Sequence, residues 1–411
     1  MGIVMKYAEE VEKAYTPITV MEEAQRCLLC HDAPCSQACP AGTAPDRFIR
    51  SIRLRNIKGA AETIRENNAL GAVCARVCPT ERYCQKACSR CGIDRPIDIS
   101  GLQRYATDAE ERFGMKVLKA APANGKKVAV VGSGPAGLQA AASLLQLGYA
   151  VDIFEKNAEA GGYLRYGIPE YRLPNAVVDT EINRIAALGA DIKTNTAVGK
   201  DISMDELTAK YDAVLLAVGF SKAKMLPMFA DSEITETAVD FLARVKQAKG
   251  EVELPQNIVV IGGGDVAMDV ATTLKMLGVK NVTDVVYEEF CEFLASKKEL
   301  AGAQALGVTI IDGYVPEKIE GRKVTFKHRR INAGLEIETD KVILAVGQQV
   351  DPEGLGLNFV KNEVEFEGYQ SANPKVFAAG DIARGDKTVV WAVRKGKEAA
   401  QAIHNFLGGK Q

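Results

Sequence analysis

The chain has 411 residues, 47% of them hydrophobic, which is enough for two or three domains with cores of their own. Its 51 Lys and Arg residues nearly balance 53 Asp and Glu residues, so no strong field is present to attract nucleic acid or an anionic membrane, and neither is expected as a partner. Residues 1–20 lack the apolar region of a secretion signal, and no apolar run approaches a membrane span. We therefore expect a cytoplasmic protein.

Most cysteines lie near the N-terminus and recur at regular spacing. Eight of them form two groups, Cys27-x2-Cys30-x4-Cys35-x3-Cys39 and Cys74-x3-Cys78-x4-Cys84-x3-Cys88, and Pro40 and Pro79 each follow a cysteine. A Cys-Pro pair is typical of ferredoxin-type cluster motifs. Without a secretion signal, disulfides are disfavoured. Eight thiolates are enough for two four-iron clusters.

Two zinc sites are the alternative use of these thiolates. Zinc sites are usually built from Cys-x2-Cys pairs, and only Cys27 and Cys30 have that spacing, so clusters are favoured. Cys91 and Cys291 stand outside the pattern, and we expect both to be small buried hydrophobic residues. The histidines are scattered along the chain and are assigned no catalytic role: His31, His328 and His404.

Residues 1–125 show no strand-like alternation and are predicted to form a helical domain, with its clearest helices at 45–54 and 59–67. Cysteine-bearing loops join these helices, so we expect the clusters themselves to form the core. The segment 121–125 contains Pro122 and Gly125 and is predicted to be a linker.

Two βαβ units with glycine-rich turns follow. In the first, a strand at 127–131 leads into the turn 132–137, a helix ends at Gly148, and a strand at 150–154 ends in Glu155. In the second, a strand at 258–261 leads into the turn 262–267, a helix ends at Gly278, and a strand at 282–287 ends in Glu288. This context favours dinucleotide binding over the alternative, a doubly wound sheet without a ligand.

The glycines of the first turn have separate physical roles. Gly132 makes the turn, Gly134 lets the backbone approach a pyrophosphate, and Gly137 lets the helix pack closely and point its positive end at the phosphates. Glu155 is placed to accept hydrogen bonds from an adenosine ribose. In the second turn Ala267 replaces the third glycine.

A shorter repeat supports a duplication. The sequence Leu-Ala-Val-Gly ends an apolar strand at 216–219 and again at 344–347, once downstream of each βαβ unit. The segment 376–381 and a helix at about 388–406 belong to neither repeat. In flavoproteins with two dinucleotide domains such a segment returns to the first domain. We therefore predict an α/β protein in which a helical two-cluster domain (1–125) precedes two Rossmann-like domains, one binding FAD (126–245 and 350–411) and an inserted one binding NAD (246–349).

A redox dithiol is missing from the places where disulfide reductases of this type carry one. The stretch Gly161-Gly162-Tyr163-Leu164-Arg165 holds no cysteine pair, and the second dinucleotide domain has only Cys291. Electrons are therefore expected to leave through the clusters.

The chain resembles the small, flavin-containing subunit of bacterial NAD-dependent dihydropyrimidine dehydrogenase, and more distantly the glutamate synthase small subunit. The resemblance covers nearly the whole chain and is carried by motifs at 26–35, 77–80, 162–174, 262–269 and 379–381. It implies that Cys27, Cys30, Cys35 and Cys88 hold one cluster, and that Cys39, Cys78, Cys84 and Gln103 hold the other. Cys74 is then a neighbour, although whether Cys74 or Gln103 is the eighth ligand stays open. Glutamate synthase small subunits generally have an acidic residue where this chain has Gln103.

The motifs and the resemblance together give a set of cofactor-binding residues. Those expected at FAD are Gly132, Ser133, Gly134, Pro135, Ala136, Gly137, Glu155, Lys156, Gly162, Tyr163, Arg172, Gly380, Asp381, Thr388 and Val389. Those expected at NAD are Gly263, Gly264, Asp265, Val266, Glu288, Ala345, Val346 and Gly347.

The resemblance implies an electron-transfer subunit that links NAD(H), FAD and two [4Fe-4S] clusters to a partner subunit. That partner would carry FMN and interconvert uracil or thymine with the 5,6-dihydro forms. The small subunit of a glutamate synthase, or of a related NAD(P)H:acceptor oxidoreductase, is the alternative. A non-catalytic scaffold that binds zinc and nucleotide is a third reading, from a different class.

Overall fold

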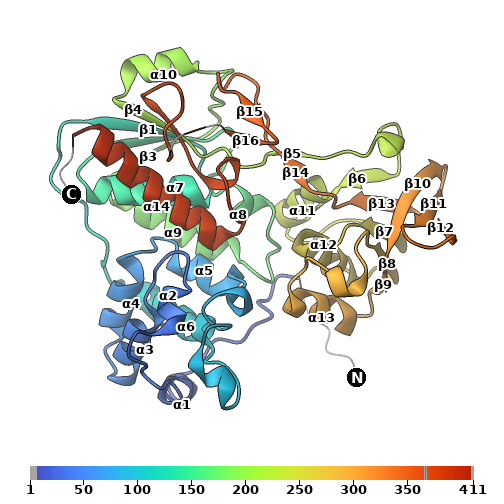
Figure 1. Ribbon diagram of the computed structural model, residues 1–411, viewed down its shortest axis with the longest axis horizontal. Helices are drawn as coiled ribbons and strands as arrows, with labels where there is room; N and C mark the ends of the chain where they lie inside the picture. The colour runs from blue at the N-terminus through green and yellow to red at the C-terminus, as the bar shows by residue number, and fades with distance from the viewer. Residues whose placement is uncertain (1–6, 365, 367, 409–411) are drawn as a thin grey trace. The chain divides into compact units, whose positions relative to one another are not determined.

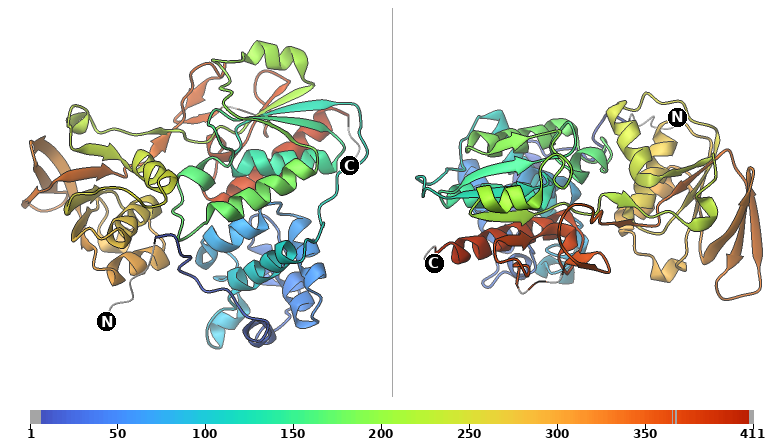
Figure 2. Two further views of the ribbon diagram at one scale, coloured as in Figure 1. Left: turned by 180° about the vertical axis from the view of Figure 1, so that it is seen from behind. Right: turned by 90° about the horizontal axis from the view of Figure 1, so that it is seen from above.

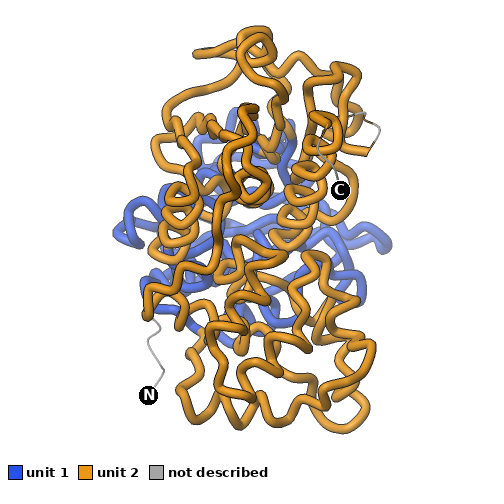
Figure 3. The backbone as a smooth tube through the Cα atoms, turned by 90° about the vertical axis from the view of Figure 1, so that its left-hand side faces the viewer, with its two compact units in different colours: residues 1–11, 165–174, 221–349 blue, residues 12–164, 175–220, 350–411 orange. Residues whose placement is uncertain are grey.

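The computed structural model describes residues 7–364, 366 and 368–408 and divides the chain into two compact units (Figures 1 and 3). Unit 1 comprises Met1–Val11, Arg165–Pro174 and Ser221–Gln349, and unit 2 comprises Glu12–Leu164, Asn175–Phe220 and Val350–Gln411. In the part of the chain that the structure describes, no helix is long and apolar enough to cross a membrane.

The first part of unit 2 is helical, as predicted. Its helices are α1 (Thr19–Gln25), α2 (Pro34–Gln37), α3 (Pro45–Arg53), α4 (Ile57–Arg65), α5 (Gly71–Val77) and α6 (Ile99–Arg112), with short 3-10 turns η1 (Thr80–Arg82) and η2 (Ser89–Gly92). α4 begins earlier than predicted because the Asn56 side chain accepts a hydrogen bond from the Gly59 N–H and caps it. One expectation was wrong: the helices have an apolar core of their own, which includes Phe48, Ile52 and Leu102, and several cysteines pack against its edge.

The second part of unit 2 is a five-stranded parallel sheet with strand order β17-β4-β1-β2-β3. The strands are β1 (Lys127–Val131), β2 (Ala150–Phe154), β3 (Asp191–Lys193), β4 (Ala213–Leu216) and β17 (Val376–Ala378). Its main helices are α7 (Pro135–Gln146), α9 (Asn175–Ala187) and α14 (Val389–Phe406), and α14 packs along α7 (Figure 2). Because β17 pairs with β4, the C-terminal segment does return to the first dinucleotide domain. The remaining elements are α8 (Tyr163–Tyr166), α10 (Met204–Lys210), β15 (Phe359–Val360), β16 (Glu363–Val364) and η5 (Gly380–Ile382).

Unit 1 contains a second five-stranded parallel sheet, with order β6-β13-β7-β8-β9. The strands are β6 (Thr235–Thr237), β7 (Asn257–Ile261), β8 (Asn281–Val285), β9 (Thr309–Ile311) and β13 (Lys341–Leu344), and the helices are α11 (Ala238–Gln247), α12 (Asp265–Met276) and α13 (Lys297–Ala305). An antiparallel sheet of β10 (Tyr314–Glu320), β11 (Lys323–His328) and β12 (Gly334–Glu338) is inserted after β9. Shorter elements are β5 (Lys222–Ala223), β14 (Gln348–Gln349), η3 (Pro227–Phe229) and η4 (Phe290–Glu292).

The limits of unit 1 differ from the residues 246–349 predicted for the NAD domain. The longest segment of the unit begins at Ser221, because β6 pairs with β13 and α11 packs on α12. It also includes the segment 165–174, whose Tyr171 belongs to the same apolar cluster as Phe241 and Met268.

A buried ion-pair network joins the cluster helices to the sheet within unit 2. The Arg65 side chain is fully buried and donates to Glu110 on α6 at 2.8 Å and to Glu181 on α9 at 3.0 Å. Glu181 also accepts from the Ala72 N–H at 2.9 Å, in the first turn of α5. Glu181 also accepts from Arg184 at 2.7 Å, and Arg65 is the fully buried cation that pairs with both carboxylates.

We expect Arg65→Met to destabilise the protein strongly. Removing one partner of a buried ion pair leaves unpaired charge, which costs about 3–5 kcal/mol. The matched control is Arg47→Met, because Arg47 is 55% exposed, pairs with Glu66 at 2.9 Å at the surface, and should cost less than about 1 kcal/mol. Urea unfolding of the holoprotein, followed by far-UV circular dichroism, measures both. Equal midpoints for the two variants would contradict this account.

Candidate iron–sulfur and dinucleotide sites

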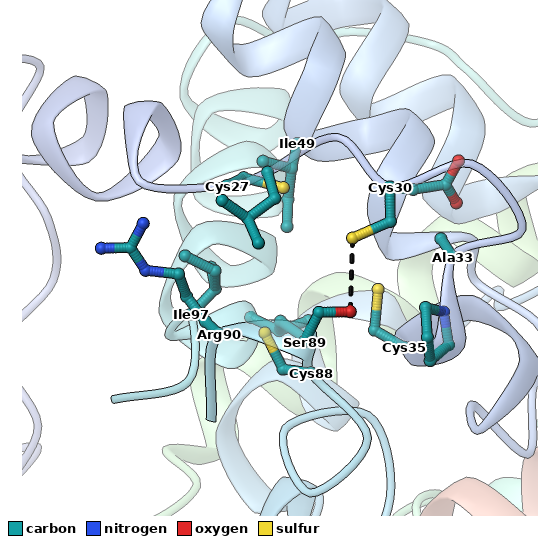
Figure 4. Close-up of a pocket in the computed structure, with 13 residues that line it drawn as sticks. Cys27, Cys30, Ala33, Cys35, Ile49, Cys88, Ser89, Arg90 and Ile97 are labelled. Carbon is teal, nitrogen blue, oxygen red and sulfur yellow. Dashed lines mark hydrogen bonds between the residues drawn. The ribbon is translucent and has the colours of Figure 1, made fainter. Parts of the chain in front are cut away.

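The first predicted group of cluster ligands lines one cavity. Cys27, Cys30, Cys35 and Cys88 surround it, and their sulfur atoms point toward a common space (Figure 4). Cys30 donates to the Ser89 hydroxyl at 3.4 Å. Three of these cysteines come from the first group and one from the second, so the fold interleaves the two groups. The donor set fits one four-iron cluster.

The second cavity is lined by the remaining candidates, Cys39, Cys78, Cys84 and Gln103, and also by Cys74. Five candidate ligands therefore line this cavity, whereas a four-iron cluster takes four protein ligands. The Gln103 amide nitrogen donates to the Gly71 carbonyl at 2.8 Å, which leaves the amide oxygen as the atom able to bind iron. Other polar residues that line this cavity are Thr43, Asn68 and Thr80. No sequence pattern indicates them, because they have no fixed spacing to the cysteines.

Single metal ions and iron–sulfur clusters require different ligand arrangements. Among the described residues, no group of three or more His, Cys, Asp or Glu side chains is arranged to hold one metal ion. A zinc ion draws its four ligands around one atom, whereas each thiolate of a four-iron cluster binds a different iron and lies further from the others. Burial raises the pKa of the Cys78 thiol well above its usual range, so thiolate formation there needs compensating positive charge.

The two cysteines outside the pattern are not buried, contrary to expectation. Cys91 and Cys291 are both exposed, in the 3-10 turns η2 and η4. Both turns are surface connections, which leave their side chains open to solvent.

The first glycine-rich turn has the geometry of a dinucleotide site. A Cβ on Gly137 would lie 2.0 Å from the Gly132 carbonyl oxygen, so only glycine allows this close packing of α7. A Cβ on Gly134 would meet nothing within 4 Å, so the backbone there faces open space at the start of α7. α7 has no side-chain cap, whereas α6, α10, α11 and α13 are capped by a side chain. Its first N–H groups are therefore available to a pyrophosphate.

The acidic residue after β2 is held against this turn. The Glu155 carboxylate accepts from the backbone N–H of Ser133 at 3.1 Å and from that of Asn157 at 2.9 Å. The Ser133 hydroxyl donates to the same oxygen as the Ser133 N–H, so the other oxygen, which accepts from Asn157, keeps a lone pair for a ribose hydroxyl. Gly162 lies against the same turn, since its Cβ would be 2.9 Å from the Gly134 Cα. Lys156 is exposed beside Glu155.

The segment between β17 and α14 completes the predicted FAD site in unit 2. A Cβ on Gly380 would lie 3.1 Å from the Ala136 Cβ, so Gly380 and Asp381 follow the sheet directly beside the first turn. The Lys395 ammonium fixes this segment by donating to the carbonyls of Gly380 at 3.2 Å and Asp386 at 2.9 Å. Burial lowers the pKa of Lys395 to about 8.

The same segment contacts the second cysteine cavity. Tyr83, next to Cys84, donates to the Asp386 carboxylate at 2.6 Å, and Val390, in the first turn of α14, lines the cavity. Thr388 at the start of α14 makes no side-chain cap, so the positive end of this helix is free to face a ligand. The first turn of α14 thus belongs to both the predicted flavin site and the predicted cluster site.

The second glycine-rich turn repeats this geometry in unit 1. A Cβ on Gly263 would lie 2.5 Å from a Glu288 carboxylate oxygen, and one on Gly262 would lie 2.5 Å from the Ala345 carbonyl oxygen. The residues predicted at NAD, 263–266, 288 and 345–347, therefore follow β7, β8 and β13 at the same edge of one sheet. α12 also lacks a side-chain cap. Ala267 is fully buried, so a methyl group fits where the first turn needs glycine.

Arg172, predicted near FAD, belongs to unit 1. Its guanidinium donates to both carboxylate oxygens of Asp269 at 2.7 Å and pairs with Glu299 at 3.1 Å. These contacts satisfy Arg172 within unit 1, and its role at FAD stays a prediction.

Comparison with known proteins assigns the family. The family model "dihydropyrimidine dehydrogenase domain II, 4Fe-4S cluster" matches residues 4–115, and the model "pyridine nucleotide-disulphide oxidoreductase" matches residues 126–396. The chain is 55% identical over 404 residues to the NAD-dependent dihydropyrimidine dehydrogenase subunit PreT of Escherichia coli (strain K12), covering 98% of both chains. It belongs to the PreT family. The predicted oxidoreductase class and the cofactor set of FAD, [4Fe-4S] clusters and NAD(H) are confirmed by this membership.

More distant relatives agree with the fold. The small chain of the NADPH glutamate synthase of Escherichia coli (strain K12) is 30% identical, over 97% of this chain and 93% of that one. Among solved structures, the oxidoreductase FprA of Mycobacterium tuberculosis has a TM-score of 0.59 at 20% identity, over 70% of this chain and 85% of that one. A thioredoxin reductase of T. acidophilum has a TM-score of 0.57 at 21% identity, over 68% and 98%. The two-dinucleotide-domain fold is thus confirmed.

Proposed function

We propose that this PreT-family chain is the electron-transfer subunit of an NAD-dependent dihydropyrimidine dehydrogenase and acts in the cytoplasm. When bound, FAD exchanges hydride with NAD(H), and the iron–sulfur clusters carry single electrons. The observation that carries the proposal is the continuity of the sites in unit 2. Val390 belongs to the helix beside the predicted flavin and lines the second cysteine cavity, and Ile99 lines both cavities. Val390 thus connects the predicted flavin site with the second cavity, and Ile99 connects the second cavity with the first.

We propose that the partner is a separate FMN-containing subunit that interconverts uracil or thymine with the 5,6-dihydro forms. Relatives 55% identical to this chain are named subunits of NAD-dependent dihydropyrimidine dehydrogenase, which supports a partner subunit. The 30% identity to a glutamate synthase small chain keeps that enzyme as the second candidate. Gln103, which lines the second cavity, argues against it.

The isolated chain should oxidise NADH with an artificial acceptor. Purified anaerobically, it should show flavin and iron–sulfur absorption, and adding NADH should bleach both and then reduce ferricyanide. Gly137→Leu, which places a bulky side chain against the Gly132 carbonyl, is expected to lose FAD and this activity. A colourless protein that contains zinc would instead support the alternative, a non-catalytic scaffold that binds zinc and nucleotide.

We expect NADH to be strongly preferred over NADPH. The Glu288 carboxylate lies against Gly263 at the ribose end of the second turn, where a 2′-phosphate would be repelled and desolvated. The ratio of kcat/KM values in ferricyanide reduction should favour NADH by at least roughly tenfold, the factor that about 1.4 kcal/mol produces. Glu288→Arg should lower the ratio of kcat/KM for NADH to kcat/KM for NADPH. A wild-type preference for NADPH would refute the assignment of Glu288 to the ribose.

A further inference from the structure

Two arginines lie in the turn that joins β11 and β12, next to the loop that follows β8. The loop 287–292 contains the ribose-end residue Glu288, and the turn contains Arg329 and Arg330. Backbone hydrogen bonds connect the two segments through Gly313. The Gly313 N–H donates to the Glu288 carbonyl at 3.1 Å, and the Arg329 N–H donates to the Gly313 carbonyl at 2.8 Å. The antiparallel sheet thus presents two guanidinium groups at the predicted adenosine end of the NAD site.

Both guanidinium groups are occupied by carboxylates of that loop. Arg329 donates to Glu292 at 2.6 Å and lies over the Tyr287 ring, 4.6 Å from its centre. Arg330 donates to Glu289 at 2.8 Å and to Glu292 at 2.7 Å. The two positive charges are balanced by two negative ones, and Glu288 adds a further carboxylate nearby.

Basic side chains at this position are what a 2′-phosphate requires, because guanidinium groups bind phosphate through paired, charge-assisted hydrogen bonds. Here two arginines are present, but their positive charges are paired with the carboxylates of Glu289 and Glu292. We propose that Glu289 and Glu292 exclude NADPH by holding Arg329 and Arg330 in ion pairs, so that the chain carries a masked 2′-phosphate site. This inference rests on the proposed binding of NAD(H) at the second glycine-rich turn and names the residues that set its specificity.

The loop allows the charges to be removed without changing its shape. Glu289 and Glu292 cap η4 reciprocally, and the Glu289 N–H donates to the Glu292 carboxylate at 3.2 Å. Glutamine serves as well as glutamate at the third helical position of a capping box, here position 292, and Glu289→Gln keeps a side-chain oxygen that can accept from the N–H of that position. Glu289→Gln with Glu292→Gln therefore keeps the cap and frees both guanidinium groups.

The test is calorimetric binding of two probes to the holoprotein, adenosine 5′-monophosphate and adenosine 2′,5′-bisphosphate. In the double variant, affinity for the bisphosphate should rise at least about tenfold, while affinity for the monophosphate stays within about twofold. Adding Arg329→Gln and Arg330→Gln to the double variant should abolish the gain. The matched control is Glu320→Gln with Glu336→Gln, which removes the same charge from exposed positions of the same antiparallel sheet.

The outcomes separate the two proposals. If the wild type binds neither probe nor NADH at the second turn, the proposed nucleotide site itself fails. If it binds the monophosphate and NADH but the double variant gains no affinity for the bisphosphate, the nucleotide site stands and the masked 2′-phosphate site is wrong. An equal gain in the control pair would assign the effect to net charge and would also overturn the inference.

Discussion

Cys78→Ser should remove one of two iron–sulfur clusters, so that anaerobically purified protein holds about four irons per chain instead of about eight. Cys78 lines the second cavity with Cys39 and Cys84. The cysteines that line the first cavity do not line the second one. Iron analysis together with absorption near 400 nm, normalised to protein, measures the loss. The first cluster should survive, because its four thiols line a separate cavity.

Cys74→Ser is the matched comparison, since Cys74 is buried and lines the same cavity. If Gln103 supplies the fourth ligand, Cys74→Ser keeps about eight irons, whereas Gln103→Leu loses about half of them. Equal iron loss in the Cys78 and Cys74 variants would show that the ligand assignment is wrong. Two zinc ions per chain in the wild type would refute the clusters altogether.

The purified chain should show no uracil or dihydrouracil turnover until an FMN-containing partner is added. NADH oxidation needs only the two dinucleotide sites, but pyrimidine reduction also needs a flavin stacked on the ring and an acid that protonates the neighbouring carbon. The two family models that match this chain describe a 4Fe-4S cluster domain over residues 4–115 and a pyridine nucleotide oxidoreductase over residues 126–396. The expected change is from no detectable rate to full turnover.

The measurement is NADH-dependent loss of uracil, followed with the chain alone, with the partner alone and with both. Ferricyanide reduction by the same preparation controls for loss of FAD or clusters. Turnover by the chain alone would overturn the division of labour. Glutamate formation with a glutamate synthase large subunit, in place of uracil reduction, would establish the second candidate.

The sequence by itself determined the elements that depend on local patterns. The strands 127–131 and 150–154 have the predicted bounds, because short, largely buried apolar runs are specified over a few residues. The cysteine spacing and the two glycine-rich turns likewise predicted the cofactors, since each motif encodes its own geometry.

The tertiary structure decided which residues from distant segments of the chain line the same cavity or site. Cysteine spacing alone does not show that Cys88 joins Cys27, Cys30 and Cys35, because that grouping depends on how the chain packs beside the first loop. The resemblance implied the grouping, and in the structure these four side chains line one cavity. Val390 reaches the second cavity only because β17 returns to β4 and α14 packs on α7. Arg329 and Arg330 carry no signal in the sequence, since their position beside Glu288 comes from backbone hydrogen bonds through Gly313 that join segments distant in the chain. Local motifs thus indicate which cofactors are bound, whereas long-range packing determines which side chains line one site.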